Sequence, residues 1–135
     1  MHEPALTDLL QAAFAARQPL LARLHAEAVV APPGFGTSET ARRLTDAGIG
    51  SIRDQVQSAS DRARLDALAA WSTAEWRTRA AQMDARAAAG FVRECHGDLH
   101  LANIVLLDDA PVPFDGIEFN DELRFIDVIC DVAFT

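Results

Sequence analysis

The chain has 135 residues, of which half are hydrophobic and 24% are charged, a composition typical of one ordinary globular domain. Its formal net charge of -8 argues against a nucleic-acid partner, because phosphate backbones bind clustered Lys and Arg. No apolar run approaches the ~20 residues that span a bilayer, and the first residues lack a signal-peptide pattern. We therefore expect a cytoplasmic protein without a membrane partner.

The charges are unevenly distributed along the chain. Ten of the 20 acidic residues lie between Glu94 and Asp131, where Arg124 is the single Arg or Lys. Such a density of like charge either faces solvent or is held together by cations. All 12 basic residues of the chain are arginine, which excludes a P-loop lysine within these 135 residues.

The first 36 residues predict a helical segment followed by a loop. Apolar residues at three- and four-residue spacing predict helix from Leu6 to about Val30, broken in two at Pro19. Residues 31–36 contain adjacent prolines and two glycines, which defeat both regular patterns.

Two short helices are predicted next. Thr37 or Ser38 can cap a helix that runs through about Ala47. Ser51 with Asp54 three residues later has the spacing of a capping box, which predicts the start of a second helix.

The longest helix is expected from near Ser60 to Ala89, with Gly90 as its stop. Trp71 and Trp76 lie within it, and aromatic residues at helical spacing are usually buried. We therefore expect both tryptophans to be core or lobe-packing residues and not part of a ligand site.

After Gly90 the pattern becomes extended. Residues 91–95 lead into a loop, residues 104–107 predict a short buried strand, and residues 111–114 predict its return partner. The prolines place that return strand at a sheet edge, because proline cannot donate to the ladder. A final helix is expected over residues 120–135.

The two cysteines, Cys95 and Cys130, lie in apolar segments without CxxC spacing. This pattern favours buried thiols over a disulfide or a zinc site. His2 and His25 are assigned no function.

Residues at the two ends of the predicted hairpin carry the chemistry. A tight hairpin returns its second strand beside the start of its first, so Asn103 and Asp115 should lie side by side. One amide oxygen and one carboxylate suit Mg²⁺, which completes its octahedron with phosphates and water. Asp98, five residues before Asn103, can accept a proton from an attacking hydroxyl.

The string His96-Gly97-Asp98-Leu99-His100-Leu101-Ala102-Asn103, followed by Phe114-Asp115, resembles the catalytic and metal-binding loops of aminoglycoside phosphotransferases, relatives of protein kinases. The kinase loop reads HRDxxxxN, and its metal-binding aspartate follows a hairpin in the same way. Residues 117–127 resemble a bacterial subgroup of phosphotransferase-like proteins that are often fused to a P-loop ATPase domain.

The resemblance implies a role for each matching residue. Asp98 would be the catalytic base, Asn103 and Asp115 the Mg²⁺ ligands, and His96 a structural member of the loop. Asp131 would match the family's buried aspartate, which accepts backbone N–H bonds from the catalytic loop.

Three further polar residues are candidates for outer support of the metal or contact with the acceptor: His100, Glu118 and Asp121. For His100, bonding to the loop backbone is the favoured interpretation. Exposed acids such as the other two are most often simply solvated.

The fold implied is α+β, mainly helical, like a kinase C-terminal lobe with one small β-hairpin and no N-terminal lobe. Residues 1–135 would form a single partial domain, with a helical part (1–90), the catalytic loop, hairpin and metal loop (91–119) and the start of a helix (120–135). The reaction would transfer the ATP γ-phosphoryl group, with Mg²⁺, to a small hydroxyl-bearing acceptor. Without a phosphate-contacting lysine, the chain is expected to be inactive unless a separate N-lobe or P-loop domain joins it.

Two other functions are compatible with the residues. His96, Asp98 and His100 could bind a metal in a hydrolase that activates water, although zincin-like histidine pairs lie on a helix. A non-catalytic remnant or a module that binds a cation or a partner through the acidic pocket is the second alternative.

Overall fold

The computed structural model describes residues 19–108 and 110–134, without the side chain of residue 134. This part of the chain is mainly helical and contains two small antiparallel sheets, so the predicted α+β class is confirmed. It divides into two compact units: residues 32–91 form one, and residues up to 31 join residues from 92 onward in the other. We call them the hairpin unit and the loop unit. The single partial domain expected over residues 1–135 stays a prediction about the chain as a whole.

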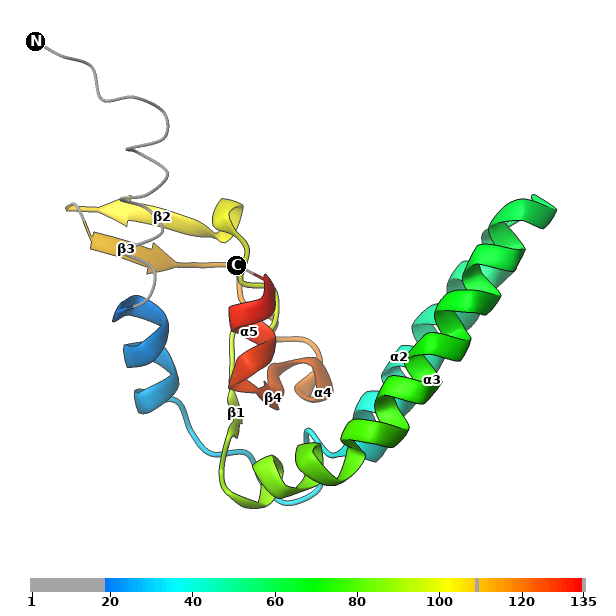
Figure 1. Cartoon of the computed structure of the whole chain (residues 1–135). Coiled ribbons are helices and arrows are strands. Elements are labelled where there is room, and N and C mark those ends of the chain that lie inside the picture. The colour runs from blue at the N-terminus through cyan, green and yellow to red at the C-terminus, as the bar shows by residue number, and fades with distance from the viewer. Residues whose placement is uncertain (1–18, 109, 135) are drawn as a thin grey trace, which may run out of the picture. The chain divides into compact units, whose positions relative to one another are not determined.

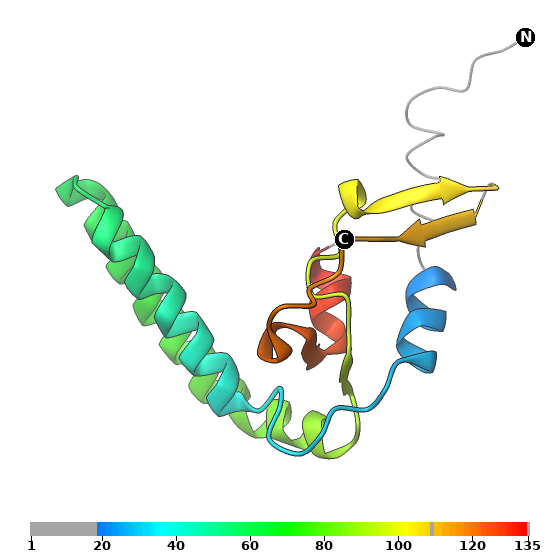
Figure 2. The same ribbon diagram turned by 180° about the vertical axis from the view of Figure 1, so that it is seen from behind.

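The hairpin unit consists of α2 (Ser38–Gln55) and α3 (Ala59–Ala88), which lie side by side in both views (Figures 1 and 2). Side chains cap both helix starts: Thr37 accepts the N–H of Thr40, and Ser58 accepts that of Asp61. Gly90, at φ +79°, ends α3 in the left-handed region, as predicted.

The prediction of two short helices in this unit is wrong. Helix α2 is continuous to Gln55. Ser51 and Asp54 lie inside the helix instead of opening a new one, and Gly48 and Gly50 are accommodated within it. A glycine costs an exposed helix only about 1 kcal/mol, which packing against α3 can offset.

Polar contacts join the two helices at both ends of the hairpin. Asp84 accepts bonds from the Ser38 backbone N–H (2.8 Å) and hydroxyl (2.9 Å), and the Trp76 indole N–H donates to the Ser38 carbonyl at 2.8 Å. Arg53 and Asp66 form an ion pair of 2.6 Å. Trp76 is half-buried, but Trp71 is 62% exposed, so it is not a core residue of this unit, and its alternative role in packing against another lobe stays a prediction. The two positions are five residues apart on α3, which turns their side chains to different faces.

The loop unit is organised around strand β1 (Val92–Glu94). β1 pairs with β4 (Phe125–Asp127) in antiparallel register, with Arg93 opposite Ile126. Its other side contacts the chain that follows the helix over residues 19–27: the Glu94 N–H donates to the Val29 carbonyl, and the Ala31 N–H donates to the Val92 carbonyl.

Only the second half of the helical segment predicted from Leu6 lies within the described residues, and the predicted loop over residues 31–36 is confirmed.

The predicted hairpin is present as β2 (Ile104–Leu107) and β3 (Ala110–Pro113), with Ile104 opposite Pro113. Asp108 adopts φ +51° in the turn between them. The expectation that the first strand is buried is wrong, since Leu106 is 67% exposed within the loop unit. A two-stranded sheet has no third strand or helix of its own to cover both faces.

The single final helix expected over residues 120–135 is also wrong. Asn120 caps a four-residue helix, α4 (Asp121–Arg124), the chain then forms β4, and α5 (Val128–Phe134) follows. The strand interrupts the predicted helix because residues 125–127 pair with β1. The two segments are about 30 residues apart in the sequence, so helical periodicity does not reveal their pairing.

The core of the loop unit is small and includes polar groups. Its buried hydrophobic residues are Leu21, Val92, Cys95 and Leu99, and Asn103 and Asp131 are buried among them. Cys95 is buried as predicted, whereas Cys130 is exposed, and neither forms a disulfide. None of the described helices is both long enough and apolar enough to cross a membrane.

Candidate active site

The loop that connects β1 to β2 contains the recognised string, and its backbone depends on Gly97. Gly97 adopts φ +82°, and a Cβ atom there would lie 2.6 Å from the carbonyl oxygen of Leu123. Leu99 is fully buried and anchors the loop in the core, while a 3₁₀ turn, η1 (Leu101–Asn103), leads into β2. No larger side chain fits at position 97 without moving the backbone.

Asp131 on α5 holds the first turn of this loop. Its carboxylate accepts the backbone N–H groups of His96 (3.1 Å) and Gly97 (3.0 Å), and it is only 2% exposed. These are the contacts that the resemblance led us to expect of Asp131. The same carboxylate lies 3.2 Å from Nε2 of His25, on the helix over residues 19–27.

Both ring nitrogens of His96 are used within the loop unit. Its Nε2 lies 2.8 Å from the carbonyl oxygen of Phe114, and its Nδ1 accepts the Asp98 N–H at 3.3 Å. These partners require a neutral ring with its proton on Nε2. His96 carbonyl also accepts the Ile117 N–H at 2.9 Å, so His96 holds the chain on both sides of Asp115.

Asp98 and Asn103 are in direct contact. The Asn103 amide group donates to the Asp98 carbonyl at 3.0 Å and reaches its carboxylate at 3.4 Å. This leaves Oδ1 of Asn103 without a hydrogen bond to any described residue, although Asn103 is 8% exposed. The His100 Nε2 atom lies 3.6 Å from the Asp98 carboxylate, and the His100 N–H donates to the Asp98 carbonyl. His100 therefore contacts both the loop backbone and the candidate base.

Asp115 directly follows Phe114, whose backbone pairs with that of Asn103. The Phe114 N–H donates to the Asn103 carbonyl at 3.0 Å, which extends the β2–β3 pairing by one step, as the hairpin argument predicted for the backbone. Asp115 adopts φ +60°, a conformation that costs a non-glycine residue about 1–2 kcal/mol. Strained non-glycine residues of this kind often occur at functional sites.

Asp98 and Asp115 open into one cleft with a volume of about 640 Å³. The remaining lining residues are Gly116, Ile117, Glu118 and Phe119. Among the residues that the structure describes, the lining contains three carboxylates and neither Arg nor Lys, and the Phe119 side chain is 85% exposed beside them. Asp121 is not part of the lining and pairs with Arg124 at 2.6 Å.

The structure places four of the predicted residues together: His96, Asp98, Asn103 and Asp131 make the contacts described above. Asp115 and Glu118 join Asp98 in the cleft lining. The metal-binding hydrolase alternative loses support, because both nitrogens of His96 already have partners and a metal would have to displace one of them.

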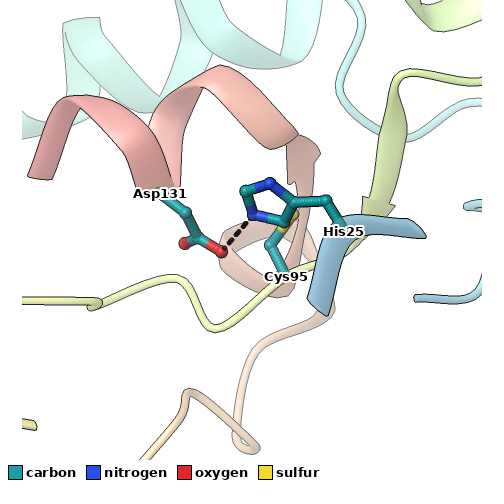
Figure 3. Close-up of side chains that lie close together, drawn as sticks. All are labelled: His25, Cys95 and Asp131. Carbon is teal, nitrogen blue, oxygen red and sulfur yellow. Dashed lines mark hydrogen bonds and ion pairs between the residues drawn. The ribbon is translucent and has the colours of Figure 1, made fainter. Parts of the chain in front are cut away.

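Two residues near the loop were missed by sequence reasoning. His25 contacts Asp131, and Cys95 lies beside both of them (Figure 3). Burial, followed by the negative charge of Asp131, raises the pKa of the Cys95 thiol from 9.0 to about 12. Because His25 and Asp131 are 106 residues apart, no motif spacing could have joined them.

Comparisons with models of known protein families, with curated proteins and with solved structures each give no match. The functional argument therefore depends on the geometry of the loop unit itself.

Proposed function

We propose that the chain is the catalytic lobe of an ATP- and Mg²⁺-dependent phosphotransferase, similar to aminoglycoside phosphotransferases, that acts on a hydroxyl group of a small molecule in the cytoplasm. The main support is one observation: Asp98 contacts Asn103, and the same Asp98 shares an acidic cleft with Asp115. A base and two oxygen ligands in that order are what phosphoryl transfer requires.

The donor set suits magnesium. The Asn103 amide group points its N–H atoms at Asp98, so its Oδ1 atom is available for a cation, and Asp115 supplies a carboxylate at the cleft. Mg²⁺ accepts one or two protein oxygens and completes its shell with phosphate and water. When bound, the ion would neutralise charge on the phosphates of ATP.

Asp98 would orient the acceptor and take its proton. The acceptor oxygen forms a bond to the γ-phosphorus, the bond between that phosphorus and ADP breaks, and the hydroxyl proton passes to the Asp98 carboxylate. Contacts with the Asn103 amide and with His100 limit the orientations available to this carboxylate.

His96 and Asp131 would position these groups without touching the substrate. Asp131 fixes the backbone before Asp98, and His96 bonds on both sides of Asp115. Together these hydrogen bonds hold the backbone at Asp98, the proposed base, and at Asp115, the proposed metal ligand. Glu118 and Phe119 line the same cleft, where a small acceptor would bind.

Phosphate binding in such an enzyme needs a basic side chain at the cleft. No lysine occurs in the 135 residues of this chain, and none of the described residues that line the cleft is an Arg. We infer that an N-terminal lobe or a P-loop domain supplies the cation that contacts the phosphates, and that turnover requires it.

A non-catalytic cation-binding module is the second candidate, favoured by the three carboxylates of the cleft. It predicts that Mg²⁺ or Ca²⁺ binds equally well with and without ATP. The phosphotransferase proposal predicts that ATP strengthens metal binding, because phosphates supply part of the metal's coordination shell.

Calorimetric titration of the chain with ATP and Mg²⁺ tests the proposal without knowledge of the acceptor. Weak Mg²⁺-dependent ATP binding is expected, and Asp115→Ala should abolish it. Asp108→Ala is the matched control, since Asp108 is also an exposed aspartate at positive φ but lies in the hairpin turn. Binding that Asp115→Ala leaves intact, or that both variants lose equally, would contradict the assignment of Asp115.

A further inference from the structure

Three metal-ligating side chains from distant parts of the sequence converge in the loop unit, separate from the cleft lining. His25 comes from the helix over residues 19–27, Cys95 follows β1, and Asp131 lies on α5 (Figure 3). Their ligand atoms all lie within 4.8 Å of one another. Cys95 and Asp131 are buried, and the His25 side chain is 14% exposed.

We propose that His25, Cys95 and Asp131 bind one Zn²⁺ ion. Imidazole nitrogen, thiolate sulfur and carboxylate oxygen are the ligand types that zinc takes in proteins, whereas Mg²⁺ and Ca²⁺ prefer oxygen alone. In a tetrahedral zinc site, nitrogen and oxygen ligands are about 3.3 Å apart, as follows from bond lengths near ~2.0 Å. The distance of 3.2 Å between His25 Nε2 and Asp131 Oδ2 already matches that spacing.

A fourth ligand is within reach of the cluster. The Cys95 Sγ atom lies 3.5 Å from the carbonyl oxygen of Ile126, to which it donates a hydrogen bond. That oxygen, or a water molecule, would complete a tetrahedral shell.

Zinc would replace the hydrogen bond between His25 and Asp131 and the one that the Cys95 thiol donates to the Ile126 carbonyl, and it would leave the backbone contacts of Asp131 in place. The contact between His25 and Asp131 Oδ2 would be lost, and the His25 proton would reside on Nδ1. The backbone N–H groups of His96 and Gly97 would continue to donate to the carboxylate, as donors commonly do to metal-bound carboxylates. The Cys95 thiol proton would leave to solvent, so each zinc bound releases one proton.

The consequence would be a metal cross-link between three segments that the sequence keeps far apart. Since Asp131 also holds the first turn of the loop, zinc would stabilise that turn. This site does not depend on the proposed phosphotransferase activity, and its test uses no nucleotide.

The experiment uses the full chain with Cys130→Ser, so that Cys95 is the single remaining thiol. After treatment with a chelator, the protein is titrated with Co²⁺, and absorption by thiolate-to-cobalt charge transfer is recorded before Zn²⁺ is added. We expect one equivalent of Co²⁺ to bind with this band, Zn²⁺ to displace it, and one proton to be released. His25→Ala and Cys95→Ser in the same background should weaken binding by more than about 100-fold, beyond the effect of losing an outer contact.

Three results would overturn the proposal: no charge-transfer band in the Cys130→Ser protein, a band that survives His25→Ala, or metal binding unchanged by Cys95→Ser. The chemical shift of the Gly97 amide shows whether each variant keeps the loop fold. If a variant does not fold, X-ray absorption of the zinc-loaded Cys130→Ser protein decides instead. One sulfur neighbour supports the site, and a shell of nitrogen and oxygen alone contradicts it.

Discussion

The two units of the chain use aspartate side chains in different ways. In the hairpin unit, the exposed Asp84 accepts two hydrogen bonds from the buried Ser38. In the loop unit, Asp131 accepts two backbone N–H bonds while almost fully buried. The difference teaches that the starts of α2 and α3 are fixed by capping residues next to them in sequence, whereas the candidate active site depends on a buried carboxylate 35 and 34 residues away from the amides that it holds.

The largest expected effect follows from removal of that buried carboxylate. Asp131→Ala should destabilise the loop unit by about 2–6 kcal/mol, since each of two orphaned amides costs ~1–3 kcal/mol. Asp84→Ala should cost the hairpin unit only about 1 kcal/mol, because water can replace the exposed carboxylate. Hydrogen exchange of the His96 and Gly97 amides measures the first effect.

Fluorescence measures the second effect, because both tryptophans of the chain, Trp71 and Trp76, lie in the hairpin unit. Equal losses of stability in the two variants would contradict the contrast between a buried and an exposed carboxylate.

A second prediction concerns the backbone of the catalytic loop. Gly97→Ala should destabilise the loop unit by about 2–4 kcal/mol, from the left-handed conformation together with the clash against Leu123. Gly116→Ala is the matched control, because a Cβ atom there would lie 3.5 Å from His96, an ordinary contact. Denaturation followed by hydrogen exchange should separate the two variants, and similar losses in both would show that position 97 is not constrained as described.

The features that depend on residues close together in the sequence could be predicted. The end of α3 was predictable because Gly90 acts through neighbouring residues, and its start, predicted near Ser60, lies within two residues of the cap Ser58. The five-residue spacing predicted that Asp98 faces the same space as Asn103, and the extended pattern of residues 104–107 and 111–114 predicted the β2–β3 hairpin.

The features that the sequence did not predict depend on contacts between distant segments. The pairing of β1 with residues 125–127 divides the predicted last helix, and packing against α3 keeps α2 continuous past Gly50. His25 carried no local signal, and its partner Asp131 is brought to it only by the fold. Burial likewise depends on tertiary packing, which is why the exposure of Leu106 was predicted wrongly.

A third prediction uses the raised pKa of Cys95. The folded protein keeps the thiol proton up to about pH 12, while the unfolded chain loses it near 9.0. Above the unfolded pKa the unfolded state therefore binds fewer protons, so stability should fall as pH rises from 9 towards 12. The chain has no Lys or Tyr, so few other side chains titrate in this range.

Thermal unfolding in the presence of a chelator measures this pH dependence. The decline should be clearly shallower in Cys95→Ala and only slightly altered in Cys130→Ser, because burial and Asp131 raise the pKa of Cys95 more than the charge of Cys130 does. A wild-type stability that does not decline above pH 9 would contradict the burial of the Cys95 thiol.

The smallest expected effect is a gain in stability at Asp115. Asp115→Gly relieves about 1–2 kcal/mol of left-handed strain and costs about 0.4–1 kcal/mol through a freer unfolded chain, so the net gain should lie between about 0 and 1.6 kcal/mol. Asp108→Gly should gain a similar amount. Thermal denaturation compares them, and only Asp115→Gly should lose nucleotide binding. Loss of binding in both would show that the hairpin turn itself matters.

Paramagnetic line broadening by Mn²⁺ with ATP tests the central claim most directly, because it detects even weak binding and locates it. The account predicts that amides near Asp98, Asn103 and Asp115 broaden, that ATP strengthens the effect, and that α2 and α3 are unaffected. Broadening that is centred in the hairpin unit, or that persists unchanged in Asn103→Ala combined with Asp115→Ala, would contradict a metal-nucleotide site at this loop.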